Sequence, residues 1–228
     1  MYTKSIFVHL LLGPTNAASF EARPSGIKPI PPIGEITMSS IQVAILLDDS
    51  ISMRAQHGGF ASRLAAVKEA AMPIIEKACL LDPNGPTLIS FGSQVHVEDG
   101  VTLERVAAVL NGIQANGTST MTGKAVAKAL EFVAQWNADG DQGLVVVFTD
   151  GAASDRDALI RIIEGYSNRM TADEQCAILF VSVGTDAIPF LTQLDDSLNG
   201  KFDIVDHKTL EEALALGVEE LFDAAFNG

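Results

Sequence analysis

The sequence predicts an α/β fold in which a mostly parallel sheet of about six strands lies between two layers of helices. Residues 41–47, 144–148 and 177–183 are almost wholly apolar, as expected of strands that are covered on both faces. The stretches between them repeat apolar residues at three- and four-residue spacing, which is typical of amphipathic helices. Strands that alternate with helices in this way favour a parallel sheet.

The other elements follow from local patterns. The tight turn at 92–94 joins two short strands into a hairpin, so one edge strand of the sheet is expected to be antiparallel. This order of elements predicts a Rossmann-like, three-layer α/β/α sandwich. The remaining elements are helices expected at 64–81, 103–110, 122–136, 155–169 and 188–194, short strands at 87–91 and 95–97, a weak strand at 202–205, and a closing helix at 210–225.

Composition excludes several classes of function. The 228 residues hold 15 Lys and Arg against 29 Asp and Glu, a net charge of −14, which argues against nucleic acid or an anionic membrane as the main partner. Cys79 and Cys176 belong to no CxxC or Cys/His cluster, so zinc and redox chemistry have no basis. Two buried free thiols in a reducing compartment are favoured, and a disulfide between them stays open.

The first 37 residues are expected to lie outside the folded domain. We interpret 1–37 as a disordered tail or an over-extended gene start, and 38–228 as a single domain. Residues 1–23 have an alternative reading as a secretory signal, although their apolar stretch is short and contains His9. The translation start, Met1 or Met38, is left open, and with it a cytoplasmic or a secreted location.

Three oxygen-rich segments point to a cation site. Asp48-Asp49-Ser50-Ile51-Ser52 follows the first apolar strand, and Thr149-Asp150-Gly151 follows a later one. Parallel strands bring their carboxyl ends to one edge of the sheet, where ligands bind. Gly117-Thr118-Ser119-Thr120 is the third segment. Carboxylate and hydroxyl oxygens suit a hard divalent cation.

These segments resemble the von Willebrand factor type A domain, in the order and spacing of that family, over about residues 40–226. The resemblance implies a metal-ion-dependent adhesion site that binds Mg²⁺ or Mn²⁺. A partner protein would supply a Glu or Asp to the metal. One departure is Ile51, where the family usually has glycine. The metal ligands implied, directly or through water, are Asp48, Ser50, Ser52, Thr118 and Asp150.

A second resemblance concerns the C-terminal part. Residues 183–186, with Phe190-Leu191 and Leu194-Asp195-Asp196, are similar to the bacterial stress-response and tellurium-resistance branch of the family. That branch is cytoplasmic, which the resemblance therefore implies for this chain.

Several alternatives to a non-enzymatic interaction domain remain. A phosphohydrolase with Asp48 as nucleophile would usually carry a second Asp at position 50, where this chain has serine. A chelatase-like subunit would need a separate ATPase chain, because no GxxxxGK[ST] loop occurs. A scaffold with an idle metal site is a further alternative. Asp49 is expected to be solvated or to lie behind the metal site, and His96 to face solvent on an edge strand.

Overall fold

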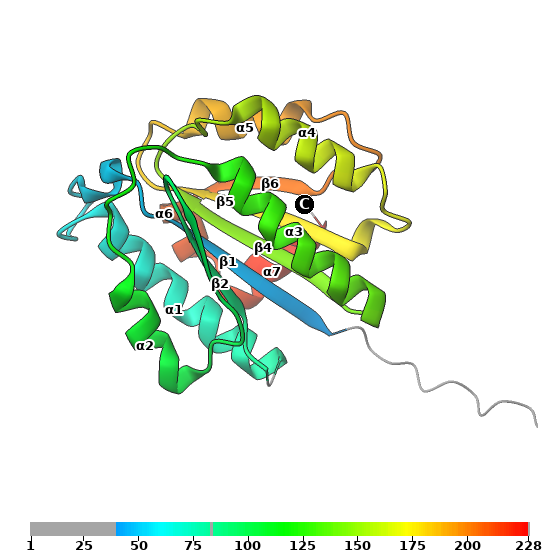
Figure 1. Ribbon diagram of the computed structural model, residues 1–228, viewed down its shortest axis with the longest axis horizontal. Helices are drawn as coiled ribbons and strands as arrows, with labels where there is room; N and C mark the ends of the chain where they lie inside the picture. Colours follow the sequence, from blue (N-terminus) through cyan, green and yellow to red (C-terminus); the bar gives the residue numbers. More distant parts are fainter. Residues whose placement is uncertain (1–39, 83, 228) are drawn as a thin grey trace, which may run out of the picture. The chain divides into compact units, whose positions relative to one another are not determined.

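The computed structural model describes residues 40–82 and 84–227, which form one domain built on a six-stranded sheet (Figure 1). The strands lie in the order β3-β2-β1-β4-β5-β6. Only the β2–β3 pair is antiparallel, so the predicted fold class is confirmed. The strands are β1 (Ile41–Asp48), β2 (Thr87–Phe91), β3 (Val95–Glu98), β4 (Gln142–Thr149), β5 (Cys176–Ser182) and β6 (Val205–Thr209).

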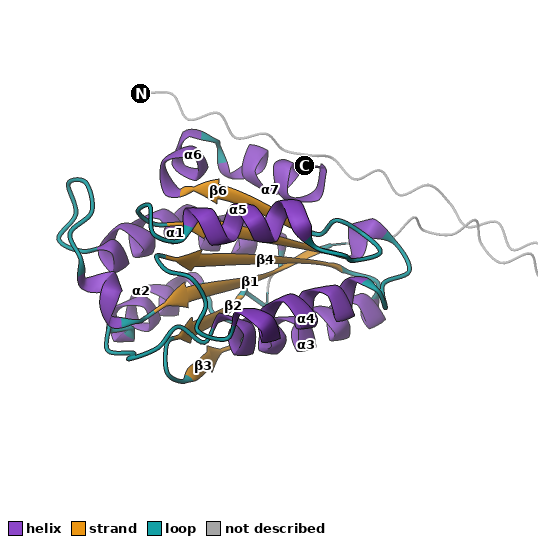
Figure 2. Ribbon diagram, turned by 90° about the horizontal axis from the view of Figure 1, so that it is seen from above, coloured by secondary structure: helices purple, strands orange, loops and turns teal. Residues whose placement is uncertain are grey.

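Helices cover both faces of this sheet (Figure 2). Apolar residues of β1, β2, β4 and β5 alternate between the two hydrophobic clusters, as the pleat of a strand requires. One face carries α1 (Arg63–Leu81), α2 (Leu103–Gly112), α6 (Leu210–Ala215) and α7 (Val218–Asn227), and the other carries α3 (Thr122–Asp139), α4 (Arg156–Ser167) and α5 (Ile188–Ser197). Two short 3₁₀ turns, Ile51–Arg54 and Asp173–Gln175, complete the described elements.

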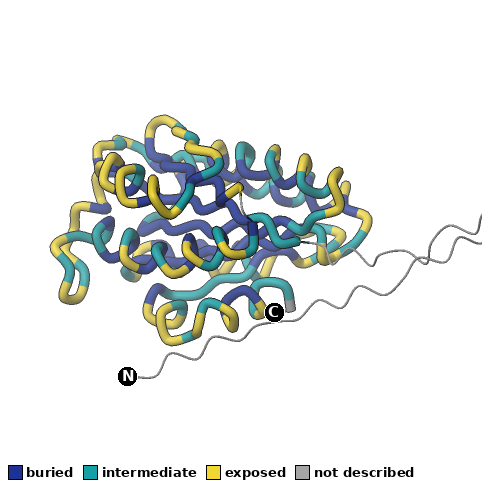
Figure 3. The backbone as a smooth tube through the Cα atoms, turned by 90° about the horizontal axis from the view of Figure 1, so that it is seen from below, coloured by how far each residue is buried: buried dark blue, intermediate teal, exposed yellow. Residues whose placement is uncertain are grey.

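The central strands form the buried interior of the domain (Figure 3). Residues 43–48 of β1 and all of β5 are buried, and the exposed residues lie in loops, on the outer faces of helices and on the edge strand β3. Burial of this apolar surface is the main favourable term in the stability of the domain. It also fixes the strand ends, and therefore the loops that follow them, relative to one another.

Two predictions near the C-terminus are wrong in detail. The strand expected at 202–205 is instead β6, Val205–Thr209, which pairs with β5 from Ile178↔Val205 onward. Its residues are mostly half-buried and polar, so hydrophobicity alone did not indicate it. The closing helix expected at 210–225 is broken into α6 and α7, because Leu216 adopts an extended conformation before Gly217. The apolar spacing continues across the break and conceals it.

Both cysteines are free, as predicted, and Cys176 is buried. Cys79 is only partly buried, so the expectation that both thiols are buried is wrong for Cys79. None of the helices in the described ranges is long and apolar enough to span a membrane. Residues 1–37 fall outside the described residues, so the boundary at 38 stays a prediction.

The packing of α3 on β4 gives a first test of the core. A Cβ added at Gly143 would lie 2.5 Å from Cγ1 of Val133, so we expect Gly143→Ala to destabilise the domain by about 1–3 kcal/mol through overpacking. Gly165→Ala in α4 is the matched control, because its nearest contact is the end of the Arg169 side chain at 3.6 Å. Urea denaturation measures both, and equal stability of the two variants would contradict this account.

Candidate metal centre

Two neighbouring strands bring the acidic segments together. β1 and β4 are parallel partners, with Leu47 opposite Phe148, so Asp48 and Asp150 lie at the same edge of the sheet, where the arrowheads of both strands point (Figure 2). The third segment joins them through a bridge between Ser50 and Gly117. All three predicted segments therefore meet at one place.

Asp48 is the buried centre of this cluster and is 0% exposed. Its Oδ1 accepts a hydrogen bond from the Ser50 backbone N–H at 2.8 Å, and its Oδ2 accepts one from Thr149 Oγ1 at 2.7 Å. Burial raises the pKa of Asp48 to about 6, against the lowering effect of these hydrogen bonds, and the nearby Asp150 adds a smaller increase. A cation beside this carboxylate would compensate for its unfavourable burial.

A chain of oxygens connects the remaining predicted ligands. The Ser50 and Ser52 hydroxyls are 3.0 Å apart, and Ser52 Oγ donates to Asp150 Oδ1 at 2.7 Å. Adjacent ligands of an octahedral Mg²⁺, each about 2.0–2.1 Å from the ion, are about 2.9 Å apart. The spacing of these oxygens therefore fits Mg²⁺. Among the described residues no three His, Cys, Asp or Glu side chains gather as a metal site, so a cation here depends on the hydroxyls.

Thr118 is near this cluster but makes different contacts. Its loop is held against β1 by two backbone hydrogen bonds, from Gly117 N to Asp49 O at 2.9 Å and from Ile51 N to Gly117 O at 2.7 Å. The exposed Thr118 hydroxyl lies 3.0 Å from Ser93 Oγ. Thus four of the five predicted ligands are linked to one another by hydrogen bonds. Thr118 is connected to them only through the backbone of its neighbour Gly117.

Arg63 is the residue of this site that the sequence analysis did not identify. Its Nη1 donates to Asp150 Oδ2 at 2.9 Å and its Nη2 donates to Asp186 Oδ2 at 3.1 Å. Asp150 has no exposed side-chain surface, whereas that of Arg63 is 17% exposed. The guanidinium packs against Gly184, where an added Cβ would lie 2.8 Å from Nη2. No local pattern marks Arg63, because it lies 87 positions from Asp150 in the chain.

Three further residues of the motif segments are Thr149, Ile51 and Asp49. Thr149, noticed only as part of a strand-end motif, is a hydrogen-bond donor to Asp48. Ile51 is 54% exposed, so its bulk does not crowd the loop. Asp49 is half-buried, not fully solvated, and burial raises its pKa while a hydrogen bond from Ser90 and the charge of His96 oppose that shift.

Comparison with known proteins agrees with this fold. Residues 43–152 match the family model of the von Willebrand factor type A domain. No curated protein matched the chain.

Solved structures share the architecture at low sequence identity. The SpRpn10 VWA domain superposes with a TM-score of 0.61 at 16% identity, over 78% of this chain and 96% of that one. The D319A mutant of the PilB minor pilin from Streptococcus sanguinis gives 0.58 at 13% identity, over 87% of this chain and 63% of that one. Manganese-loaded TRAP protein from Plasmodium vivax gives 0.54 at 16% identity, over 78% and 71%. The described domain therefore has the von Willebrand factor type A fold, and residues 43–152 carry that family's sequence pattern.

Proposed function

We propose that this domain is a non-enzymatic, divalent-metal-dependent protein-interaction module that binds Mg²⁺ or Mn²⁺. The observation that supports it best is a continuous set of oxygens between the loops that follow β1 and β4, in which neighbouring atoms are 2.7–3.0 Å apart. These oxygens belong to Ser50, Ser52 and Asp150, next to the buried carboxylate of Asp48. Thr118 completes the set with the lone pairs that its contact with Ser93 leaves available.

The partner supplies an acidic side chain to the metal. Only two carboxylates face the ion, and Arg63 already neutralises part of the charge of Asp150. An ion with mainly hydroxyl and water ligands retains a strong attraction for a further carboxylate, so a Glu or Asp of the partner completes its shell. The manganese in the related TRAP structure supports a divalent ion at such a fold.

The setting we propose is a bacterial stress or tellurium-resistance system in the cytoplasm. This proposal is supported by the segment Val183-Gly184-Thr185-Asp186, which resembles the stress-response branch of the family. In this fold the segment has a direct connection to the metal site, because Asp186 binds Arg63. Measuring whether the domain binds Mn²⁺ distinguishes this function from a scaffold with an idle metal site.

One serine and one threonine substitution test the proposed metal ligands. We expect Ser52→Ala and Thr118→Ala to weaken Mn²⁺ binding by about tenfold or more in isothermal titration, because each removes one oxygen ligand. Ser197→Ala, at the exposed end of α5, is the control and should bind as the parent does. If Ser52→Ala keeps the parent affinity, or if the parent binds no Mn²⁺ at millimolar concentration, the proposed metal site is wrong.

A further inference from the structure

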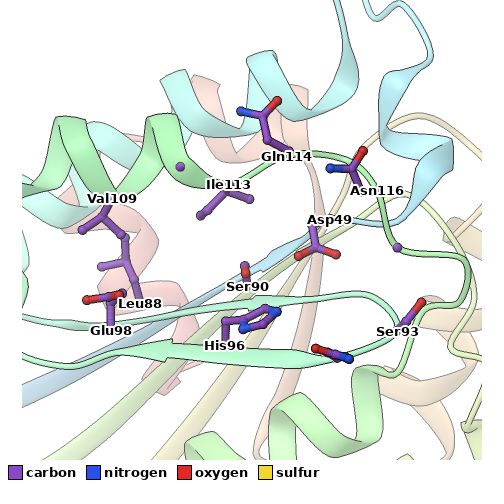
Figure 4. Close-up of a pocket in the computed structure, with 13 residues that line it drawn as sticks. Asp49, Leu88, Ser90, Ser93, His96, Glu98, Val109, Ile113, Gln114 and Asn116 are labelled. Atoms are coloured by element: carbon purple, nitrogen blue, oxygen red, sulfur yellow. The ribbon is translucent and has the colours of Figure 1, made fainter.

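A groove next to the metal centre has no role in the function proposed above. It is a cavity of about 670 Å³ between the β2–β3 hairpin on one side and, on the other, the end of α2 with the loop that follows it (Figure 4). Leu88, Ser90 and His96 come from the hairpin, and Val109 and Ile113 from the opposite wall.

The groove follows from the edge position of β3. Val95 and Val97 pack on the face covered by α3, and His96 and Glu98 therefore turn to the other face. Their cross-strand partners on that face are Ser90 and Leu88. His96 and Glu98 are exposed, so this face of the hairpin is not fully covered by helices, and the two side chains line the open groove.

Asp49 places a fixed negative charge in this groove. Its carboxylate is held between two glycines: an added Cβ would lie 2.3 Å from Oδ1 at Gly92 and 2.9 Å at Gly117. Figure 4 shows the carboxylate directed toward Ser90 and His96. Among the described residues no lysine or arginine lies within ion-pair distance of Asp49, and none lines the groove.

The lysine and arginine that bind the loop wall of the groove already have backbone partners. Lys68 Nζ donates to the Ile113 carbonyl at 2.7 Å, and Arg54 Nε donates to the Ala115 carbonyl at 2.7 Å. These two bonds hold the loop wall in place. The second carboxylate of the groove, Glu98, pairs with Arg105 at 3.1 Å, but both side chains are 53% exposed, so this contact is weak.

We infer that the groove binds a lysine or arginine side chain of a protein partner, with its alkyl part along Leu88, Val109 and Ile113 and its charged end at Asp49. Charge complementarity and shape support this occupant. A basic side chain has an apolar stem that fits apolar walls, and a cationic head for a carboxylate that has no lysine or arginine partner among the described residues. The inference rests on the proposed function only in assigning both contacts to one partner, which then presents an acidic and a basic residue side by side.

The test uses the full chain and excludes metal, so that it stands apart from the metal site. N-acetyl-arginine amide and N-acetyl-lysine amide are titrated into ¹⁵N-labelled protein in EDTA, and N-acetyl-citrulline amide serves as the neutral probe. We expect shifts of amide signals from the groove residues with one or both basic probes and none with citrulline. Shifts spread over the surface, or equal binding of citrulline, would overturn the inference.

Two variants and a control separate a specific site from the attraction of a chain of net charge −14. Asp49→Asn is expected to weaken the basic probe by about tenfold, the usual effect of losing a hydrogen bond to a charged group. Gln114→Lys, at an exposed position on the groove wall, should weaken it too by competing for Asp49, and it does not depend on a buried change. Asp139→Asn removes the same charge at the exposed end of α3 and should leave binding unchanged. The proposed site would be contradicted if the control lost as much affinity for the basic probe as the groove variants, or if neither groove variant lost affinity.

Discussion

In the absence of metal, Asp48→Asn is expected to be more stable than the parent protein at neutral pH. The folded-state pKa of Asp48 is about 6, against an ordinary value of 3.8, so keeping it ionised in the fold costs about 3 kcal/mol. Asparagine removes that cost and fits the site. Its amide oxygen can accept from the Ser50 N–H, and Thr149 can turn its hydroxyl toward the Gly151 carbonyl at 3.2 Å.

The stability difference between Asp48→Asn and the parent is expected to grow as pH rises. Well below its ordinary pKa of 3.8, Asp48 is protonated in both the folded and the unfolded state, and the cost is absent. As pH rises from about 4 to about 6 the unfolded state loses its proton first, so the parent loses stability relative to the variant. Urea denaturation in EDTA at pH 4.5 and 7.5 measures the difference between the two proteins. A difference that does not grow with pH would contradict the raised pKa.

Adding metal is expected to reverse the order. An ion that binds only the folded state stabilises it by RT ln(1 + [L]/Kd), which is about 4.1 kcal/mol at 1,000 times the Kd and exceeds the cost of about 3 kcal/mol given above. The parent should gain this stabilisation from Mg²⁺ or Mn²⁺ and Asp48→Asn should not, since the variant lacks the buried carboxylate. A melting temperature that rises equally in both proteins would place the ion elsewhere.

Arg63→Gln is expected to cost about 3 kcal/mol of metal-free stability, the usual effect of removing one partner of a buried ion pair. The variant leaves Asp150 buried beside Asp48 with no positive charge. For the same reason its melting temperature should rise more with Mg²⁺ than that of the parent, because the ion becomes the only cation for the two carboxylates. Thermal unfolding with and without Mg²⁺ measures both effects.

Lys128→Gln is the matched control for this variant. It also removes a cation from an ion pair, with Glu131 at 2.6 Å, but both side chains are largely exposed, so the expected cost is below about 1 kcal/mol. Arg63 would have no part in the metal site if its variant lost no more stability than this control, or responded to Mg²⁺ as the parent does.

Local patterns in the chain were enough to predict the architecture. Runs such as 41–47 and 144–148 are apolar throughout because both faces of a central strand are buried, and that constraint can be read along the chain. The same runs end at Asp48 and Thr149, so the edge of the sheet at which the acidic segments meet followed from the parallel order of the strands. Where local polarity and packing disagreed, as at β6 and at the break before α7, the pattern was misleading.

The surroundings of the proposed metal centre depend on contacts between distant residues. Arg63 reaches Asp150 across 87 positions, and the carboxylate of Asp49 lies against Gly92 and Gly117, which belong to two other loops. No periodicity encodes such contacts, because they depend on how α1 and the β2–β3 hairpin pack on the sheet. The sequence thus indicated the oxygens that we propose as ligands of a cation. Packing set the charges around them, since these depend on which distant side chains share a buried space.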